Sequence, residues 1–254
     1  MPSRRVMPRN VVGIGMEKVR GCTTGNLPGG AYVRSMTRIA IVGGHGKIAR
    51  LLIPVLVDAG HQPVALVRNP DHTSELQDLG AEVVLLDIEK SDDDDFAQAF
   101  TGAGAVVFAA GGGGDGNIER KKTVDLGGSL KSIAGATAAG VRRFVQISAI
   151  SVDEPLGDDV EDSWKAYVEA KREADVVLRA SDLDWTIIRP GGLTDHDGTG
   201  SVTLAETVDR GEIPRADVAA VIAAVIDDPT THGKQWELVS GPTPIADAIA
   251  GAVS

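Results

Sequence analysis

The stretch IVGGHGKIAR, residues 41–50, decides the fold, because it joins the end of an apolar strand to a glycine turn and the start of a helix. Gly43, Gly46 and Ala49 give the spacing G-x-x-G-x-x-A. Glycines permit a tight turn in which backbone N–H groups approach a pyrophosphate, and the following helix directs its partly positive N-terminus at the same phosphates. The residues predicted to bind the phosphates of a dinucleotide are Gly43, Gly46, Lys47 and Ile48. The alternative is a glycine-rich turn without a ligand, and the strand–turn–helix context favours the dinucleotide.

Outward from this turn, apolar runs of strand length alternate with segments of helical spacing. The pattern predicts strands at 38–44, 62–70, 81–87, 103–111, 142–151 and 184–190. It predicts helices at 47–60, 74–80, 92–102 and 117–139, and a further helix that carries WKAYVEAKREAD (164–175). Strands separated by helices imply right-handed crossovers and a parallel sheet covered on both faces. The predicted fold class is therefore α/β, a doubly wound parallel sheet of the Rossmann type.

The pattern loosens after Pro190, where a short strand at 200–206, a helix at 214–228 and a strand at 234–240 are expected. About 65 residues are too few for an independent large domain. Residues 191–254 are therefore predicted to form a small C-terminal lobe that closes over the sheet on the substrate side. Together, residues 37–254 are predicted to form a single NAD(P)-binding domain.

The first residues differ from the rest in charge and pattern. Residues 1–35 hold six Arg or Lys against one Glu, a net charge of +5, whereas the remainder carries −16. Gly and Pro interrupt the segment and no hydrophobic periodicity is present, which predicts a disordered extension over residues 1–36. Met36 directly precedes the first strand, so a second interpretation is that translation starts there. A third, an Arg-rich transit peptide, is disfavoured by the glycines.

Composition narrows the function classes. The net charge of −11 repels phosphate backbones, so no nucleic-acid partner is expected. Cys22 is the single cysteine, and the aspartates at 92–95 are interpreted as a solvated helix start, so no metal site is expected. No apolar run approaches the roughly 18 residues of a membrane span, and no secretory signal is evident. A cytoplasmic protein with a small-molecule substrate is expected, and its oligomeric state is left open.

Residues at the ends of the predicted strands bear on the choice of cofactor. An NAD site would place an acidic residue at the end of the second strand, and none lies between Gln62 and Pro70. Arg68 lies there instead, and its guanidinium suits a 2′-phosphate, so NADP(H) is favoured over NAD(H). Asp87 is predicted to approach the adenine side. The alternative for Arg68 is a surface arginine at a strand end, and the alternative for Asp87 is a helix-capping or loop carboxylate. Small residues that would let a cofactor lie across the sheet edge are Ala109, Ala110 and Gly111.

Tyr167 and Lys171 lie four residues apart, on one face of their predicted helix. In a dinucleotide fold this helix runs beside the nicotinamide end of the site. The phenol could exchange a proton with a substrate carbonyl or alcohol, and the ammonium is expected to lower the pKa of Tyr167 from about 10 toward neutral pH. Lys171 is also expected to hold the nicotinamide ribose hydroxyls. The alternative is a packed tyrosine beside a solvated lysine.

From Thr37 to Ser240 the sequence resembles the atypical short-chain dehydrogenase/reductase superfamily. It is most similar to small bacterial NAD(P)H-binding proteins of the NmrA-like and flavin-reductase-like kind. The resemblance is carried by GGHGKIA, VALVRNP, FAAG, FVQISA, YVEAK, DWTIIRPGGLTD and RADVA. It implies a Rossmann fold with NADP(H) at these loops, and it implies that Tyr167 and Lys171 match the catalytic Tyr and Lys. Pro190, in the segment RPG, then lines the nicotinamide pocket.

This sequence departs from the family's pattern at one position. In the family, a serine usually follows the fifth strand, often as a Ser-Ser pair. Here the strand reads QISAIS, so Ser148 and Ser151 are both candidates for the third catalytic residue. A serine hydroxyl would be an extra donor to a developing oxyanion. The alternative is that Ser148 merely ends the strand.

Three functions are compatible with these features. The first is an NADP(H)-dependent oxidoreductase that transfers hydride to a small carbonyl compound, a quinone or a flavin, and it is motivated by the glycine turn, Arg68 and the Tyr–Lys pair together. The second is a non-catalytic redox sensor that binds NADP(H) and reports to a partner. The third is a nucleotide-sugar epimerase or dehydratase, which the short segment after Pro190 disfavours.

Overall fold

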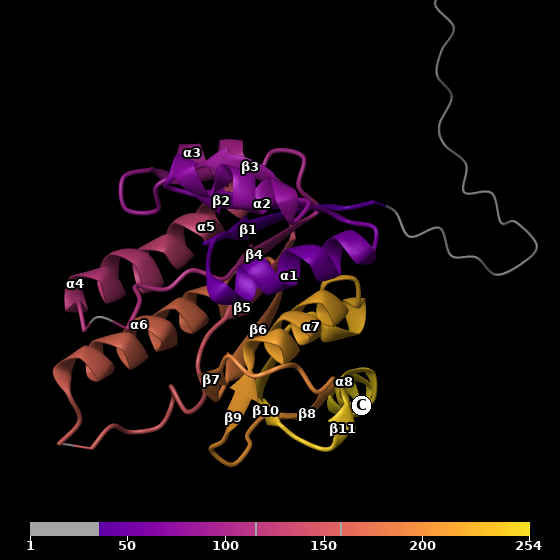
Figure 1. Cartoon of the computed structure of the whole chain (residues 1–254). Coiled ribbons are helices and arrows are strands. Elements are labelled where there is room, and N and C mark those ends of the chain that lie inside the picture. The colour runs from indigo at the N-terminus through magenta and orange to yellow at the C-terminus, as the bar shows by residue number, and fades with distance from the viewer. Residues whose placement is uncertain (1–35, 115, 158) are drawn as a thin grey trace, which may run out of the picture. The chain divides into compact units, whose positions relative to one another are not determined.

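The computed structural model describes residues 36–114, 116–157 and 159–254, and Ser35–Ser254 form one compact unit. The interpretations of residues 1–35, with Cys22, lie outside the described residues. Within the described part of the chain, nine strands form one sheet (Figure 1). In spatial order they are β3 (Glu82–Leu85), β2 (Gln62–Val67), β1 (Arg38–Val42), β4 (Ala105–Phe108), β5 (Arg143–Ile147), β6 (Asp184–Pro190), β10 (Lys234–Ser240), β8 (Ser201–Ala205) and β11 (Thr243–Pro244).

The seven strands from β3 to β10 are parallel to their neighbours, and β8 and β11 pair antiparallel. The order 3-2-1-4-5-6 is that of a doubly wound Rossmann fold, and it places the switch point between β1 and β4. The predicted fold class is confirmed. Ligands of open α/β sheets bind beyond the carboxyl ends of the strands at this point.

Helices cover both faces of the sheet. The helices are α1 (Lys47–Asp58), α2 (Thr73–Asp78), α3 (Asp93–Ala99), α4 (Ile118–Arg120), α5 (Gly127–Ala138), α6 (Asp162–Arg179), α7 (Arg215–Ile226) and α8 (Ile245–Val253). Short 3-10 segments are η1 (Pro70–His72) and η3 (Pro229–Thr231), and η2 (Lys121–Leu126) is a π-helix. Figure 1 shows α7 beside α1, and α5 lies against α3 and α6.

Strand periodicity explains the two hydrophobic layers. Ile39 and Ile41 of β1 pack with α1 and α7, whereas Ala40 and Val42 pack with the phenylalanines of α3 and β4. Every one of these four side chains is fully buried. Successive residues of a strand point to opposite faces, so a sheet covered on both sides requires the continuous apolar runs seen in the sequence.

Two helices show how local sequence sets their ends. α3 begins with a capping box, in which the Asp92 carboxylate accepts from the Asp95 N–H and the Asp95 carboxylate accepts from the Asp92 N–H. The aspartates at 92–95 thus serve a helix start, as the sequence predicts. α1 continues through Pro54 to Asp58, although proline removes one backbone hydrogen bond.

The segment after Pro190 differs from the expected lobe. Instead of closing over the sheet, β10, β8 and β11 extend it, and α7 packs on α1. The pair β7 (Gly192–Thr194) and β9 (Glu212–Pro214) forms a separate small sheet. The central residues of β10, Trp236–Val239, are buried on both faces of the strand, which fits its position inside the sheet beside β6.

Over the described ranges, no helix has the length and hydropathy that a membrane crossing needs. In the same part of the chain, no group of three or more His, Cys, Asp or Glu side chains is placed to hold a metal ion.

Candidate functional site

The glycine turn between β1 and α1 is built without room for side chains. Gly43 has φ +81°, and a Cβ there would lie 2.7 Å from the Ala110 Cα. A Cβ on Gly44 would lie 2.6 Å from that of Ala65 in β2. Gly46 caps α1 without any side-chain hydrogen bond, so the first N–H groups of the helix face the sheet edge unblocked. These features fit close approach of a pyrophosphate to the backbone.

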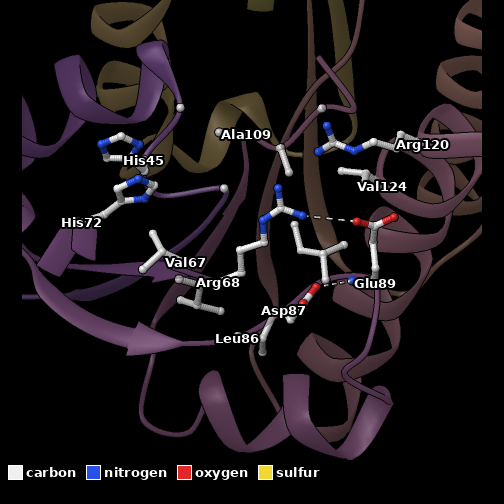
Figure 2. A pocket seen from close by; sticks show the side chains of 16 residues that line it. His45, Val67, Arg68, His72, Leu86, Asp87, Glu89, Ala109, Arg120 and Val124 are labelled. Carbon is white, nitrogen blue, oxygen red and sulfur yellow. Dashed lines mark hydrogen bonds and ion pairs between the residues drawn. The ribbon is translucent and has the colours of Figure 1, made fainter. Parts of the chain in front are cut away.

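One pocket of about 280 Å³ lies beyond the ends of β1, β2, β3 and β4 (Figure 2). The predicted residues that line it are Gly43, Gly46, Arg68, Asp87, Ala109, Ala110 and Gly111. Figure 2 shows Arg68 in the middle of the pocket, directed at Glu89, and an Arg68 Nη1 to Glu89 Oε2 distance of 3.4 Å joins them. The Asp87 carboxylate accepts from the Glu89 N–H at 3.1 Å. A half-exposed guanidinium is thus available at the position expected for a 2′-phosphate.

Two histidines form one side of this pocket. His45 of the glycine turn and His72 of η1 stack with ring centroids 3.4 Å apart (Figure 2). His45 Nε2 lies 2.9 Å from the Glu75 carboxylate, which also accepts from Arg50. The hydrogen bonds from Arg50 and His45 lower the pKa of Glu75 to about 2. His45 is therefore held at the wall of this pocket, beside the glycine turn.

A second pocket of about 1040 Å³ shares Ala109, Ala110 and Gly111 with the first. The other predicted residues that line it are Lys47, Ile48, Ser148, Tyr167, Lys171 and Pro190. Its wall also includes residues 112–114 and 116, the segments 147–150 and 190–193 that end and follow β5 and β6, and residues at the start of α6. The glycine turn lies between the two pockets. Together they offer room for the two halves of a dinucleotide and, in the larger one, a substrate.

Tyr167 and Lys171 of α6 lie in the wall of the larger pocket, as their spacing predicts. The Lys171 ammonium is buried 5.9 Å from the centre of the Tyr167 ring, and it donates to the Ile147 carbonyl at 3.2 Å. Its Nζ also lies 3.3 Å from Asp125 Oδ1. The Asp125 carboxylate, itself fully buried, accepts from the Gly112 N–H at 2.8 Å. Lys171 is therefore a neutralised member of a buried ion pair rather than a free cation.

The expected pKa shift of Tyr167 is wrong in sign. Burial raises the pKa of the phenol above its ordinary value of about 10, and the attraction of Lys171 only partly offsets this. Asp125 and Asp175 raise the pKa of Tyr167 further. The sequence shows the lysine four residues away but does not show that two carboxylates lie near. Asp125 comes from η2, and Asp175 comes from a later turn of α6. The phenol therefore keeps its proton at neutral pH.

Ser148 directly follows β5 and lies in the pocket wall, but its hydroxyl donates to Asp175 Oδ2 at 2.8 Å. Gln146 and Arg189 donate to the same buried carboxylate. Ser151, the other candidate serine, is not a wall residue of either described pocket. It has φ +59°, a rare conformation for a residue with a side chain, and its N–H donates to the buried Glu237 carboxylate. Ser151 thus shapes the turn after β5.

Three residues of the larger pocket escaped the sequence analysis. Lys121 and Asp125 point inward from η2, where a π-turn replaces the expected regular helix. Trp164 lies at the pocket and stacks at an angle on Tyr167, with ring centroids 5.3 Å apart. The sequence KKTVD, which begins five residues after the last glycine of the 111–116 loop, is a signal for the first two, since charged residues on a mostly buried helix need a role. π-turns are frequent at functional sites.

Fold and site together define a dinucleotide-binding protein of the Rossmann class, with a Tyr–Lys pair beside the wider pocket. The model of the NAD(P)H-binding family matches residues 43–229, and the chain belongs to this family. It lies in the atypical short-chain dehydrogenase/reductase class with NmrA-like proteins, as the sequence resemblance implies. The match runs from the glycine turn past the end of α7, so it includes the wall residues of both pockets.

The chain is similar to several proteins over most of their length. It is 37% identical over 213 residues to the uncharacterized sugar epimerase YhfK of Bacillus subtilis, spanning 84% of this chain and 98% of the relative. A solved structure of a candidate NAD-dependent epimerase/dehydratase from Bacillus halodurans superposes with a TM-score of 0.79 at 38% identity, covering 85% and 99% of the two chains. A (4-alkanoyl-5-oxo-2,5-dihydrofuran-3-yl)methyl phosphate reductase of Streptomyces griseus is 29% identical, covering 82% and 69%. The family is thus oxidoreductase-like.

Proposed function

We propose that the protein is an NADP(H)-dependent oxidoreductase that reduces a small carbonyl compound, a quinone or a flavin. The observation that carries the proposal is the position of a protonated Tyr167 in the larger pocket, which continues past the glycine turn into the smaller one. Membership of an NAD(P)H-binding family with reductases among the relatives supports the cofactor class. The preference for NADP(H) and the substrate belong to the proposal.

The residues present fit this cofactor. The uncapped N-terminus of α1 and the glycine turn would hold the pyrophosphate, and Arg68 would bind the 2′-phosphate after leaving Glu89. Lys171, held by Asp125, would donate to the nicotinamide ribose hydroxyls. When bound, the reduced nicotinamide supplies the hydride.

Tyr167 performs the proton transfer in this mechanism. As the substrate carbon accepts hydride, the carbonyl oxygen gains negative charge, and the phenol donates its proton to that oxygen. The phenol is ready for this step because burial raises its pKa and keeps it protonated. Lys171 holds positive charge near the ring, 5.9 Å from its centre, and so stabilises the tyrosinate that remains.

The names of two relatives favour a second candidate, epimerisation or dehydration of a sugar nucleotide. That chemistry would use the same tyrosine, first as a base and then as an acid. It would leave no net change in the redox state of the cofactor, so it predicts turnover of a sugar nucleotide without consumption of NADPH. The sensor hypothesis predicts cofactor binding and no turnover with any acceptor.

The test is a comparison of Tyr167→Phe with the wild-type chain. We expect the variant to bind NADPH as wild type does in a fluorescence titration, and NADH to bind more weakly to both. We expect its rate of NADPH oxidation with 4-nitrobenzaldehyde, menadione or FMN to fall by a factor of roughly 10²–10⁴, the usual contribution of a general acid.

The control is Lys165→Met, a change on the same helix two residues before the tyrosine, outside the wall of the described pockets. It should leave both binding and turnover unchanged. Full activity in Tyr167→Phe would remove the tyrosine from the mechanism, and absence of NADPH binding by the wild-type chain would overturn the proposal.

A further inference from the structure

Lys121 is a buried cation in the wall of the larger pocket. Its side chain projects from the π-turn η2, and only 6% of the residue surface is exposed. Its ammonium donates to the Gly113 carbonyl and lies 5.4 Å from the centre of the Tyr167 ring. A carbonyl dipole and a ring face compensate a buried charge only in part.

The other cations of this pocket each have a carboxylate. Lys171 is paired with Asp125, and Lys47 and Arg215 share Asp195, at distances of 2.5 Å and 2.6 Å. Within the described residues, no carboxylate lies within ion-pair distance of Lys121. The other acidic wall residue, Glu161, accepts instead from the Ser163 hydroxyl at 2.8 Å. Lys121 is therefore the wall cation whose charge an incoming anion could neutralise.

The surroundings of Lys121 leave space for such an anion. The loop that contacts it is rich in glycine, and a Cβ built on Gly114 or Gly116 would meet nothing within 4 Å. Lys121 also lies on the Tyr167 side of the pocket, whereas the phosphates of a dinucleotide belong at the glycine turn. An anion at Lys121 would thus be part of the substrate and not of the cofactor.

We propose that the substrate carries an oxyanion group, a carboxylate or a phosphate, in addition to its reducible carbonyl, and that Lys121 binds this group. The proposal rests on the proposed reductase function for the carbonyl and on the geometry around Lys121 for the anion. The ammonium would keep the Gly113 carbonyl as one partner and take the oxyanion as a second. The carbonyl end of the substrate would then lie at the Tyr167 hydroxyl.

The experiment compares three benzaldehydes that differ in their para substituent. 4-Carboxybenzaldehyde and 4-formylphenyl phosphate carry the two oxyanions, and 4-nitrobenzaldehyde is neutral; because the three aldehydes differ in intrinsic reactivity, each is compared between variant and wild type. In the full-length chain, Lys121→Met should lower kcat/KM for at least one anionic aldehyde about tenfold or more, because it removes a charge-assisted hydrogen bond. The value for 4-nitrobenzaldehyde should change less than about threefold. Lys121→Arg should retain the preference for the anion.

The matched control is Lys122→Met, the exposed neighbour in the same π-turn, which should leave all three values unchanged. Calorimetric titration of the same compounds into the free chain and into the chain saturated with NADP+ measures binding without turnover. Weaker anion binding in Lys121→Met alone would support the proposal even in a protein that reduces none of the aldehydes. Equal binding of anionic and neutral compounds by wild type and Lys121→Met would overturn it, even where NADPH-dependent reduction is established.

Discussion

At the scale of single residues, Tyr167 shows how a pocket reverses a pattern-based expectation. A lysine four residues away is expected to lower a tyrosine pKa, but burial and the carboxylates of Asp125 and Asp175 raise it. The direction matters for the reaction. A raised pKa favours the protonated phenol, which suits reduction of a carbonyl and disfavours oxidation of an alcohol at neutral pH.

This raised pKa predicts the pH dependence of both directions. Reduction needs the protonated form of Tyr167, which is the dominant form below its pKa. We therefore expect kcat/KM for 4-nitrobenzaldehyde reduction to stay level from about pH 6 to 9 and to fall only above about pH 10, as the phenol loses its proton. Oxidation of the corresponding alcohol should rise over the same alkaline range. Initial rates with NADPH and NADP+ across this range measure both, and a reduction rate that declines between pH 7 and 8 would contradict the assignment.

Ser148 shows the limit of a residue-level resemblance. Its place at the end of β5 follows from the strand pattern, and the structure brings it into the pocket wall. Its hydroxyl proton, however, is directed to Asp175, a residue of α6 that also accepts from Gln146 and Arg189. No sequence pattern links these four positions, because they meet only when β5, β6 and α6 pack together. Ser148 therefore lines the pocket and also donates one of the hydrogen bonds that hold the buried Asp175 carboxylate.

At the scale of elements, the strand–turn–helix unit at 41–50 was predictable, because its glycines, apolar run and helical spacing are all local. The parallel sheet with helices on both faces followed from the alternation of strands and helices. The π-turn at Lys121–Leu126 was not predictable, since a single extra residue in a helical turn leaves the apolar spacing almost unchanged. Because this turn was not predicted, neither were two of its residues: Asp125, which pairs with Lys171, and Lys121, which lies beside the Tyr167 ring. The C-terminal strands were expected, but their addition to the sheet depends on pairing with β6.

The close fit of this turn makes Gly44→Ala a test of the element. A methyl group at Gly44 would lie 2.6 Å from the Ala65 Cβ and 2.7 Å from its Cα, so β1 and β2 would have to separate. We expect the free energy of unfolding to fall by roughly 1–3 kcal/mol, as at other overpacked sites. We also expect NADPH to bind more weakly, because the turn that would hold its pyrophosphate is displaced. Thermal unfolding and the fluorescence titration measure the two effects.

The matched control is Gly251→Ala in α8, where a Cβ would meet nothing within 4 Å. Alanine is favoured over glycine in a helix, so this change should be neutral or stabilising by up to about 1 kcal/mol. The same loss of stability in both variants would refute the argument from close packing.

At the scale of the whole molecule, the packing joins the N-terminal and C-terminal halves of the described unit. One hydrophobic cluster contains Leu52 and Ile53 of α1 together with Ile222 of α7 and Leu238 of β10. All four side chains are fully buried. β10 lies between β6 and β8, so its removal would expose two strand edges as well as this cluster. The arrangement explains why residues 191–254 are not expected to behave as a separate domain.

This packing predicts one cooperative unfolding transition for residues 37–254. Trp185 of β6 and the buried Trp236 of β10 should report the same midpoint in urea as far-UV circular dichroism, and calorimetric and van't Hoff enthalpies should agree. Leu238→Ala should lower stability by about 2–5 kcal/mol and shift that single transition down by roughly 5–15 °C. If the C-terminal segment unfolds on its own, two transitions will appear and Leu238→Ala will move one of them. NADPH, which we propose binds at the glycine turn after β1, should raise the midpoint of the variant and of wild type alike, because a ligand stabilises the whole unit that unfolds with its site.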